Sequence, residues 1–145
     1  MLEPVPISQL PVPVWNIPGT VQCGFPSPAQ DHAQKRLDLN DLLVKQPDAT
    51  FFMRVRGDSM RDDGILDGDY VIVDRSVTPA HGRIVVAVID GEYTVKRLYK
   101  RKGVVRLDCA NPTFAHIELK DGQELYVWGV VTWTFRPHTT NNASP

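Results

Sequence analysis

Two side chains in this sequence, Ser59 and Lys96, have surroundings that suit nucleophilic chemistry. Ser59 lies in a loop rich in glycine and aspartate that follows the alternating apolar and basic residues 51–56. A serine just past a strand can present its hydroxyl and nearby backbone N–H groups to one point, as a nucleophile beside an oxyanion hole requires. Ser, Gly and Asp are also the usual turn residues, so the loop taken alone favours a surface turn.

Lys96 lies on the second strand of a predicted hairpin. Residues 84–90 form a long apolar run, Asp90-Gly91 is a strong hairpin-turn signal, and residues 93–99 form the return strand. A period of two residues places Lys96 on one face with Thr94 and Leu98, and Arg97 on the opposite face.

The environment of this strand decides what Lys96 can do. If the face with Leu98 packs inward, burial lowers the pKa of the lysine amine, because desolvation disfavours the charged form. A neutral Lys96 next to the Ser59 hydroxyl would make a Ser-Lys dyad, an alternative to Ser-His-Asp. On an edge strand the lysine would instead extend its amine to solvent.

Several motifs together resemble the LexA/UmuD family of self-cleaving proteins. The resemblance extends over roughly residues 21 to 136, most of the chain. It is carried by GDSM at 57–60, ILDGDYVIVD at 65–74, the turn at 81–82, DGEYTVKRL at 90–98, CGFPSP at 23–28, LDLN at 37–40 and WGVV at 128–131.

The resemblance implies a site and a reaction. Ser59 would be the nucleophile, Lys96 its general base, and the Cys23–Gly24 bond the substrate. The backbone N–H groups near Asp58 and Ser59 would hold the oxyanion. No cofactor or metal is implied.

The resemblance also implies a setting for that reaction. A RecA filament on single-stranded DNA would stimulate the cleavage as part of the SOS response to DNA damage. The protein would be a homodimer, and its processed form would join a Y-family, error-prone translesion polymerase of the UmuC type.

Residues 1–23 form a proline-rich arm. Proline fixes φ and removes backbone donors, so the arm should be extended and should form neither a stable helix nor a central strand. It would deliver residues 21–25 to a protease site, where the small Cys23 and the flexible Gly24 suit a narrow cleft. We therefore expect an arm (1–23) removed by self-cleavage, a peptidase domain (24–137) and a flexible tail (138–145).

The predicted architecture is mostly β: a small, twisted domain of at least six short strands joined by hairpins. Further strands are expected within 104–109, 116–119 and 124–135, with a turn at Asp121-Gly122 and a bulge or close approach at Gly129. One or two short helices should cover the sheet, starting at Ser27 or at Asp38 and ending before Pro47. The aromatic residues of the last strand suit a core or a dimer contact.

Composition is that of an ordinary soluble domain. The 145 residues are 42% hydrophobic and 23% charged, with a net charge of −1. No apolar run approaches the roughly 20 residues that span a bilayer, and no secretory signal is evident, so we expect a cytoplasmic protein without membrane contact. Cys23 and Cys109 suit free thiols there, although the sequence leaves a disulfide open. Cysteines and histidines do not have metal-site spacing, and His81 in a turn is a weak candidate base.

Three alternatives compete with self-cleavage. A LexA-type repressor needs a helix-turn-helix, for which the proline-rich arm is unsuited, so direct sequence-specific DNA binding is not expected. A non-catalytic module would bind polymerase and RecA only. A signal-peptidase-like enzyme acting in trans would need a membrane segment.

Overall fold

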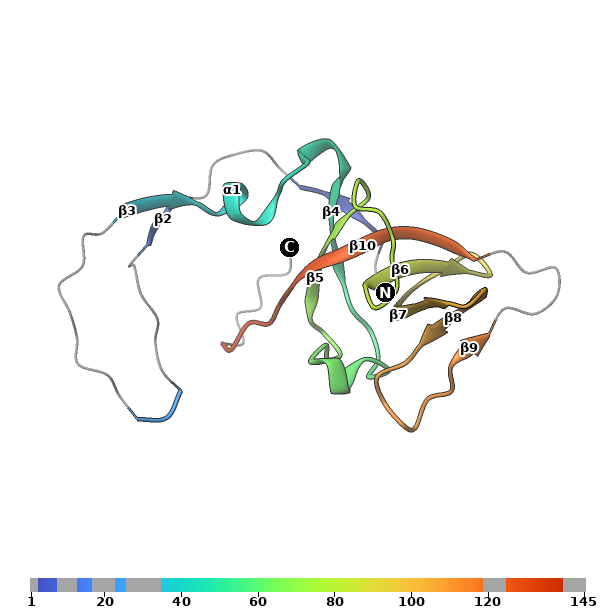
Figure 1. The fold of residues 1–145 in the computed structure, drawn as a ribbon. Coiled ribbons are helices and arrows are strands. Elements are labelled where there is room, and N and C mark those ends of the chain that lie inside the picture. The colour runs from blue at the N-terminus through green and yellow to red at the C-terminus, as the bar shows by residue number, and fades with distance from the viewer. Residues whose placement is uncertain (1–2, 8–12, 17–22, 26–34, 119–124, 140–145) are drawn as a thin grey trace. The chain divides into compact units, whose positions relative to one another are not determined.

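The computed structural model describes residues 3–7, 13–16, 23–25, 35–118 and 125–139. The chain divides into two compact units, one of Met1–Ile7 with Gln46–Pro145 and the other of Ser8–Lys45. The first unit holds a large β-sheet, and the second holds a two-stranded sheet and a short helix (Figure 1).

Among the described residues, eight strands of the first unit form one antiparallel sheet in the order β1-β4-β5-β10-β6-β7-β8-β9. The mostly β fold predicted from the sequence is therefore confirmed. The strands are β1 (Val5–Pro6), β4 (Thr50–Arg54), β5 (Tyr70–Asp74), β6 (Ile84–Ile89), β7 (Glu92–Arg101), β8 (Val104–Asp108), β9 (Ile117–Glu118) and β10 (Tyr126–Phe135).

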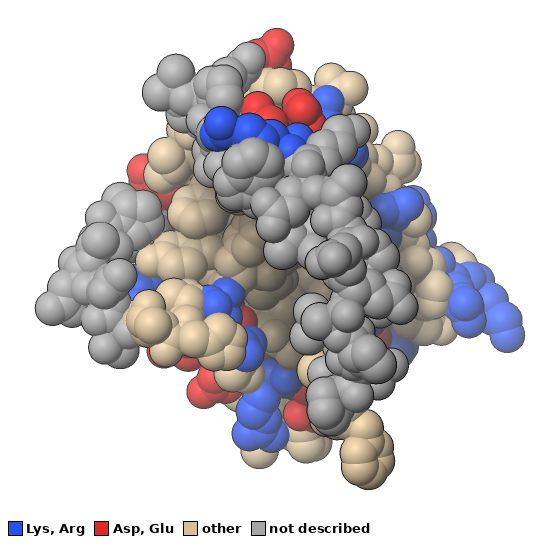
Figure 2. Space-filling model, turned by 90° about the vertical axis from the view of Figure 1, so that its left-hand side faces the viewer, with Lys and Arg blue, Asp and Glu red and all other residues tan. Residues whose placement is uncertain are grey.

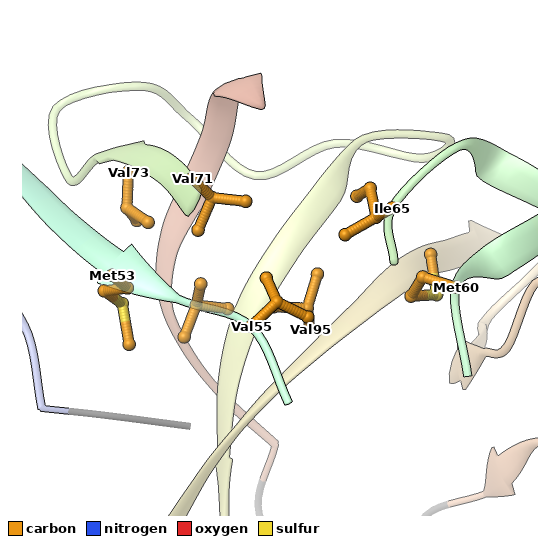
Figure 3. Packing of buried hydrophobic residues seen from close by; sticks show 8 residues of the cluster. Met53, Val55, Met60, Ile65, Val71, Val73 and Val95 are labelled. Atoms are coloured by element: carbon orange, nitrogen blue, oxygen red, sulfur yellow. The ribbon is translucent and has the colours of Figure 1, made fainter. Parts of the chain in front are cut away.

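The central strands are buried on both faces. Val85 and Ala87 of β6 belong to one apolar cluster and Val86, between them, belongs to another. Burial on both faces explains why these strands are continuous apolar runs instead of alternating ones. The first cluster (Figure 3) contains Met53, Val55, Met60, Ile65, Val71, Val73, Val86 and Val95. The second contains Val85, Ala87, Leu98, Leu107 and Val130.

Two-residue turns set the register of the hairpins on either side of β7. The predicted turn at Asp90-Gly91 is confirmed, with φ of +49° and +79°. Lys102-Gly103 repeats this geometry between β7 and β8, with φ of +50° and +73°. Positive φ at both central residues matches the right-handed twist of the strands. The turn predicted at Asp121-Gly122 lies outside the described residues.

Gly129 is both a bulge and a point of close approach, as predicted. The pairing of β10 with β6 shifts register between Val127 and Gly129. A Cβ atom on Gly129 would lie 2.6 Å from Cγ1 of Val73 and 3.3 Å from Cγ of Arg75. The missing side chain therefore lets β10 pack tightly against β5.

The helices among the described residues are short, and the first of them begins at Leu39. Asp38 caps α1 (Leu39–Leu43) as predicted, because its side chain accepts a hydrogen bond of 3.0 Å from the Asn40 N–H. The helix ends before Pro47, which instead starts a 3-10 helix, η1 (Pro47–Ala49). The helix start predicted at Ser27 lies outside the described residues. In the part of the chain that the structure describes, no helix is long and apolar enough to cross a membrane.

Proline-rich segments occur here as short extended pieces. In the first unit β1 pairs with β4 at the edge of the large sheet, where a proline without an N–H is tolerated. In the second unit β2 (Pro13–Asn16) pairs with β3 (Lys35–Asp38).

Candidate active site

The loop between β4 and β5 carries Ser59 and is held largely by its own aspartates. Asp67 Oδ1 accepts a hydrogen bond of 2.8 Å from the Gly57 N–H, and Asp58 Oδ1 accepts one of 3.4 Å from the Asp67 N–H. Gly57 has a φ of +88°, which a residue with a Cβ atom rarely adopts. The Gly and Asp residues therefore do form a turn, as their types indicate, and the same turn determines the backbone conformation that leads to Ser59.

Two apolar side chains that follow Ser59 in the sequence anchor the loop in the core. Met60 and Ile65 are each 2% exposed and pack into the first apolar cluster (Figure 3). Between them lies the 3-10 helix η2 (Arg61–Asp63), and the Ile65 N–H donates to the Met60 carbonyl at 3.2 Å. Because Met60 directly follows Ser59, its burial restrains the backbone of the serine.

Lys96 on β7 contacts Ser59 directly. Its Nζ atom lies 2.9 Å from Ser59 Oγ, 2.9 Å from Thr94 Oγ1 and 3.0 Å from the Val95 carbonyl oxygen. Lys96 is 7% exposed and Leu98 is 3% exposed. The face with Lys96 and Leu98 therefore packs inward, which is the condition under which the sequence expects Lys96 to be buried.

Arg97 contacts a different part of the same loop. Its guanidinium lies 2.8 Å from the Asp63 carboxylate and also donates to the Gly82 carbonyl. Asp63 lies in η2, so Arg97 ties that turn to the start of the β6–β7 hairpin. Of these two adjacent residues of β7, Lys96 therefore contacts the serine and Arg97 contacts the loop that carries the serine.

The burial of Lys96 destabilises its charged form. Desolvation by burial lowers the pKa of Lys96, while the nearby Cys109 acts in the opposite direction. A neutral amine has two N–H donors and one lone pair. All three oxygen atoms can accept a hydrogen bond from the ammonium form of Lys96. In the neutral form, donation to the Thr94 hydroxyl and the Val95 carbonyl would leave the lone pair for the Ser59 hydroxyl.

Backbone donors beside Ser59 are available for an anionic oxygen. In the described structure the N–H groups of Asp58, Ser59 and Met60 have no hydrogen-bond acceptor. The flanking donors are engaged, since Gly57 donates to Asp67 and Arg61 donates to the Asp58 carbonyl at 3.2 Å. This is the pattern of free N–H groups that an oxyanion hole needs.

The segment after β8 also holds the loop, which the sequence did not reveal. The Ala110 N–H donates to the Ser59 carbonyl at 2.7 Å, and the Asp62 N–H donates to the Ala110 carbonyl at 2.7 Å. The Asn111 side chain donates to the Asp58 carbonyl at 2.8 Å. The dipeptide Asn111-Pro112 indicates only a turn, and no spacing links it to residues 58–62. The sequence therefore did not predict this contact.

A small hollow opens beside the Ser59–Lys96 pair, with a volume of about 60 Å³. This volume suits a side chain or a carbonyl group of a peptide and is far below that of a typical small-molecule pocket. The hollow is lined by Val55, Arg56, Gly57, Ser59, Met60, Tyr93, Thr94, Val95 and Lys96.

The other candidate residues have different surroundings. The Nδ1 atom of His81 accepts a hydrogen bond of 3.1 Å from the Lys100 N–H, and its ring packs against Tyr99. Cys23 and Cys109 are free, and the Cys109 thiol donates to the Ala115 carbonyl at 3.3 Å. Across the described ranges, no group of three or more His, Cys, Asp or Glu residues could hold a metal ion.

The Cys23–Gly24 bond lies in an exposed bend of the second unit. Cys23 and Gly24 are exposed, and Phe25 is 91% exposed. Gly24 has a φ of +132°, and a Cβ atom there would have no heavy atom within 4 Å. Exposed bends of this kind are the segments that proteases cut most readily.

A family model and several known proteins are similar to this chain over more than half of its length. Residues 13–132 match the family model described as Peptidase S24-like. The protein MucA of Salmonella typhimurium is 42% identical over 118 residues, which are 81% of this chain and 81% of MucA. ImpA of the same species is 55% identical over 80 residues, 55% of each chain. The LexA repressor of Syntrophotalea carbinolica is 39% identical over 123 residues, 81% of this chain and 57% of the repressor.

The chain therefore belongs to the peptidase S24-like family. This membership confirms the resemblance to the LexA/UmuD family and supports a peptidase-type activity. Within the family, the similarity to MucA and ImpA is consistent with a UmuD-type protein.

Proposed function

We propose that this chain is a self-cleaving serine endopeptidase that hydrolyses its own Cys23–Gly24 bond. Ser59 is the nucleophile and Lys96 is the general base. The observation that carries the proposal is the hydrogen bond of 2.9 Å between Lys96 Nζ and Ser59 Oγ, made by a lysine that is 7% exposed. Burial lowers the pKa of the Lys96 amine, and a neutral amine can accept the serine proton.

The reaction has two stages. Lys96 takes the Ser59 hydroxyl proton as the oxygen attacks the Cys23 carbonyl carbon, and the resulting oxyanion accepts hydrogen bonds from the N–H groups of Asp58 and Ser59. The C–N bond then breaks, Lys96 passes its proton to the amine of Gly24, and an ester on Ser59 remains. Lys96 takes a proton from water as the water oxygen attacks this ester. The C–O bond to Ser59 then breaks, Lys96 returns the proton to the serine oxygen, and residues 1–23 leave as a carboxylic acid that ionises in solvent.

The substrate is part of the same protein, so local concentration replaces affinity. Docking of residues 21–25 in the hollow beside Ser59 would remove further water from Lys96 and lower its pKa again. A partner that favours docking would therefore speed the reaction. From the family resemblance, we propose that a RecA filament on single-stranded DNA has this role during the SOS response.

The product that begins at Gly24 is proposed to act in the cytoplasm as a homodimeric accessory subunit of a UmuC-type, Y-family translesion polymerase. The similarity to MucA and ImpA supports this proposal. The charge of the chain fits a protein partner, because the net charge is −1 and basic and acidic groups are interspersed on the described part of one face (Figure 2). Such a surface gives little general attraction to nucleic acid.

A pH series on the purified chain, followed by intact mass spectrometry, tests the peptidase. A product beginning at Gly24 should accumulate faster as the pH rises, because the neutral fraction of Lys96 increases. Ser59→Ala and Lys96→Ala should yield no product. Absence of cleavage at every pH, with and without RecA filament, would refute the Ser-Lys assignment and favour a non-catalytic binding module.

A further inference from the structure

Asn111 is a buried polar side chain for which the reaction above gives no role. It is 5% exposed and follows β8 by three residues. Its Nδ2 atom donates to the Asp58 carbonyl at 2.8 Å. Its Oδ1 atom accepts from the N–H and the hydroxyl of Thr113, at 3.1 Å and 2.8 Å. The Thr113 contacts fix which way the amide faces, so its NH₂ group points to the serine loop.

The carbonyl that Asn111 holds lies in the same peptide plane as the Ser59 N–H. A trans peptide is planar, and its C=O and N–H point in opposite directions. Fixing the Asp58 oxygen therefore fixes the direction of the Ser59 N–H. That N–H has no acceptor in the described structure. Its direction is therefore fixed while it remains available to donate a hydrogen bond.

The neighbouring peptide is held from the same segment. The Ala110 N–H donates to the Ser59 carbonyl at 2.7 Å, which fixes the plane that contains the Met60 N–H. Two consecutive peptide planes around the serine are thus oriented by two consecutive residues after β8. A loop that served only as a surface turn would not need both.

We propose that Asn111 is a positioning residue for catalysis, which aims the Ser59 N–H at the oxyanion of the peptide-cleavage reaction. This inference rests on the proposed function and adds a residue to it. It predicts that loss of the Asn111 amide lowers the rate of the chemical step without changing the protonation of Lys96. The hydrogen bonds of Asn111 go to Asp58 and Thr113, whereas those of Lys96 go to Ser59, Thr94 and Val95.

The test measures first-order self-cleavage of the full chain from neutral to alkaline pH. Asn111→Leu removes the amide and keeps a side chain of similar size, and Asn111→Ala is a second variant. Removal of one oxyanion donor usually costs about 10²–10³ in rate, so misdirecting one should lower the plateau rate about tenfold to a hundredfold. The pH midpoint of the profile should stay at the wild-type value.

Thr113→Val is the matched control, because it removes the partly buried hydrogen bond from the Thr113 hydroxyl to Asn111. The Thr113 N–H still donates to Asn111, so the amide keeps its direction and its own donor. It should keep at least a third of the wild-type plateau rate. Rates are divided by the folded fraction from circular dichroism and measured again in sucrose, which favours the folded state.

Wild-type plateau rates in both Asn111 variants would overturn the inference while leaving the peptidase intact. Recovery of the rate in sucrose would also overturn it, since the loss would then come from unfolding. If the wild-type chain itself does not cleave, the proposed function fails and the inference fails with it.

Discussion

The Thr94 hydroxyl should control the pH at which the chain cleaves itself. Its Oγ1 atom lies 2.9 Å from Lys96 Nζ, and both residues are on the inward face of β7. An acceptor oxygen stabilises an ammonium group more than a neutral amine. Thr94→Val replaces the hydroxyl with a methyl group of similar size, so it should lower the pKa of Lys96 further and shift the rate profile to lower pH.

The size of the effect follows from the two protonation states. A hydrogen bond involving a charged group is worth about 1.5–3 kcal/mol, and one between neutral groups about 0.5–1.5 kcal/mol. The difference of about 1–1.5 kcal/mol corresponds to about fivefold to thirteenfold more neutral amine at a pH well below the midpoint. The plateau at high pH should fall, because the amine loses a partner that directs its lone pair to Ser59.

The assay is the rate of Gly24 product formation as a function of pH for wild type, Thr94→Val and Thr94→Ser. The serine variant keeps the hydroxyl and should reproduce the wild-type midpoint. A midpoint for Thr94→Val that is unchanged or higher would refute the reasoning, because it would show that the hydroxyl does not stabilise the ammonium form.

Two further predictions concern stability. Lys96→Met should abolish cleavage but raise the free energy of unfolding at neutral pH. The free energy of unfolding of the wild-type chain should itself rise by about 1.36 kcal/mol per unit of increasing pH between the folded and the unfolded pKa of Lys96. In this range the unfolded state binds more protons than the folded state. Urea titrations at neutral and alkaline pH should show the advantage of the variant shrinking as the pH rises, and a constant difference would contradict the linkage. Gly129→Ala should destabilise the sheet by about 1–3 kcal/mol in the same assay, because its Cβ would lie 2.6 Å from Val73 Cγ1, and an equal stability would show that β10 can shift away.

Local sequence signals predicted the parts of this fold that depend on neighbours in the chain. Asp90-Gly91 adopts the left-handed pair of conformations that its turn demands, and Asp38 caps a helix. Gly129 interrupts β10 with a shift in register. Each of these residues acts through the backbone within a few positions or through the absence of a side chain, so its type alone is informative.

Strand order and the depth of the site depended on contacts that the sequence does not encode locally. Nothing in the chain between 104 and 135 indicated that β10 would insert between β5 and β6. The same long-range packing decides whether Lys96 is buried, since it needs β7 to be an interior strand. The periodicity of the strand therefore predicted which face Lys96 lies on, whereas its burial depends on the order of the strands in the sheet. The contact of Asn111 with Asp58 is of this second kind as well.

The interior position of β7 links stability to reactivity. A strand covered on both faces is where a lysine is least favourable as a cation, and Lys96 is 7% exposed there. The penalty is reduced by three oxygen partners, two of which lie on β7 itself. Those two cannot move away from the amine without disrupting the strand, whereas Ser59 lies on a loop. The sheet thus fixes the position of the base, and the contacts from residues 110 and 111 add to those that restrain the nucleophile loop.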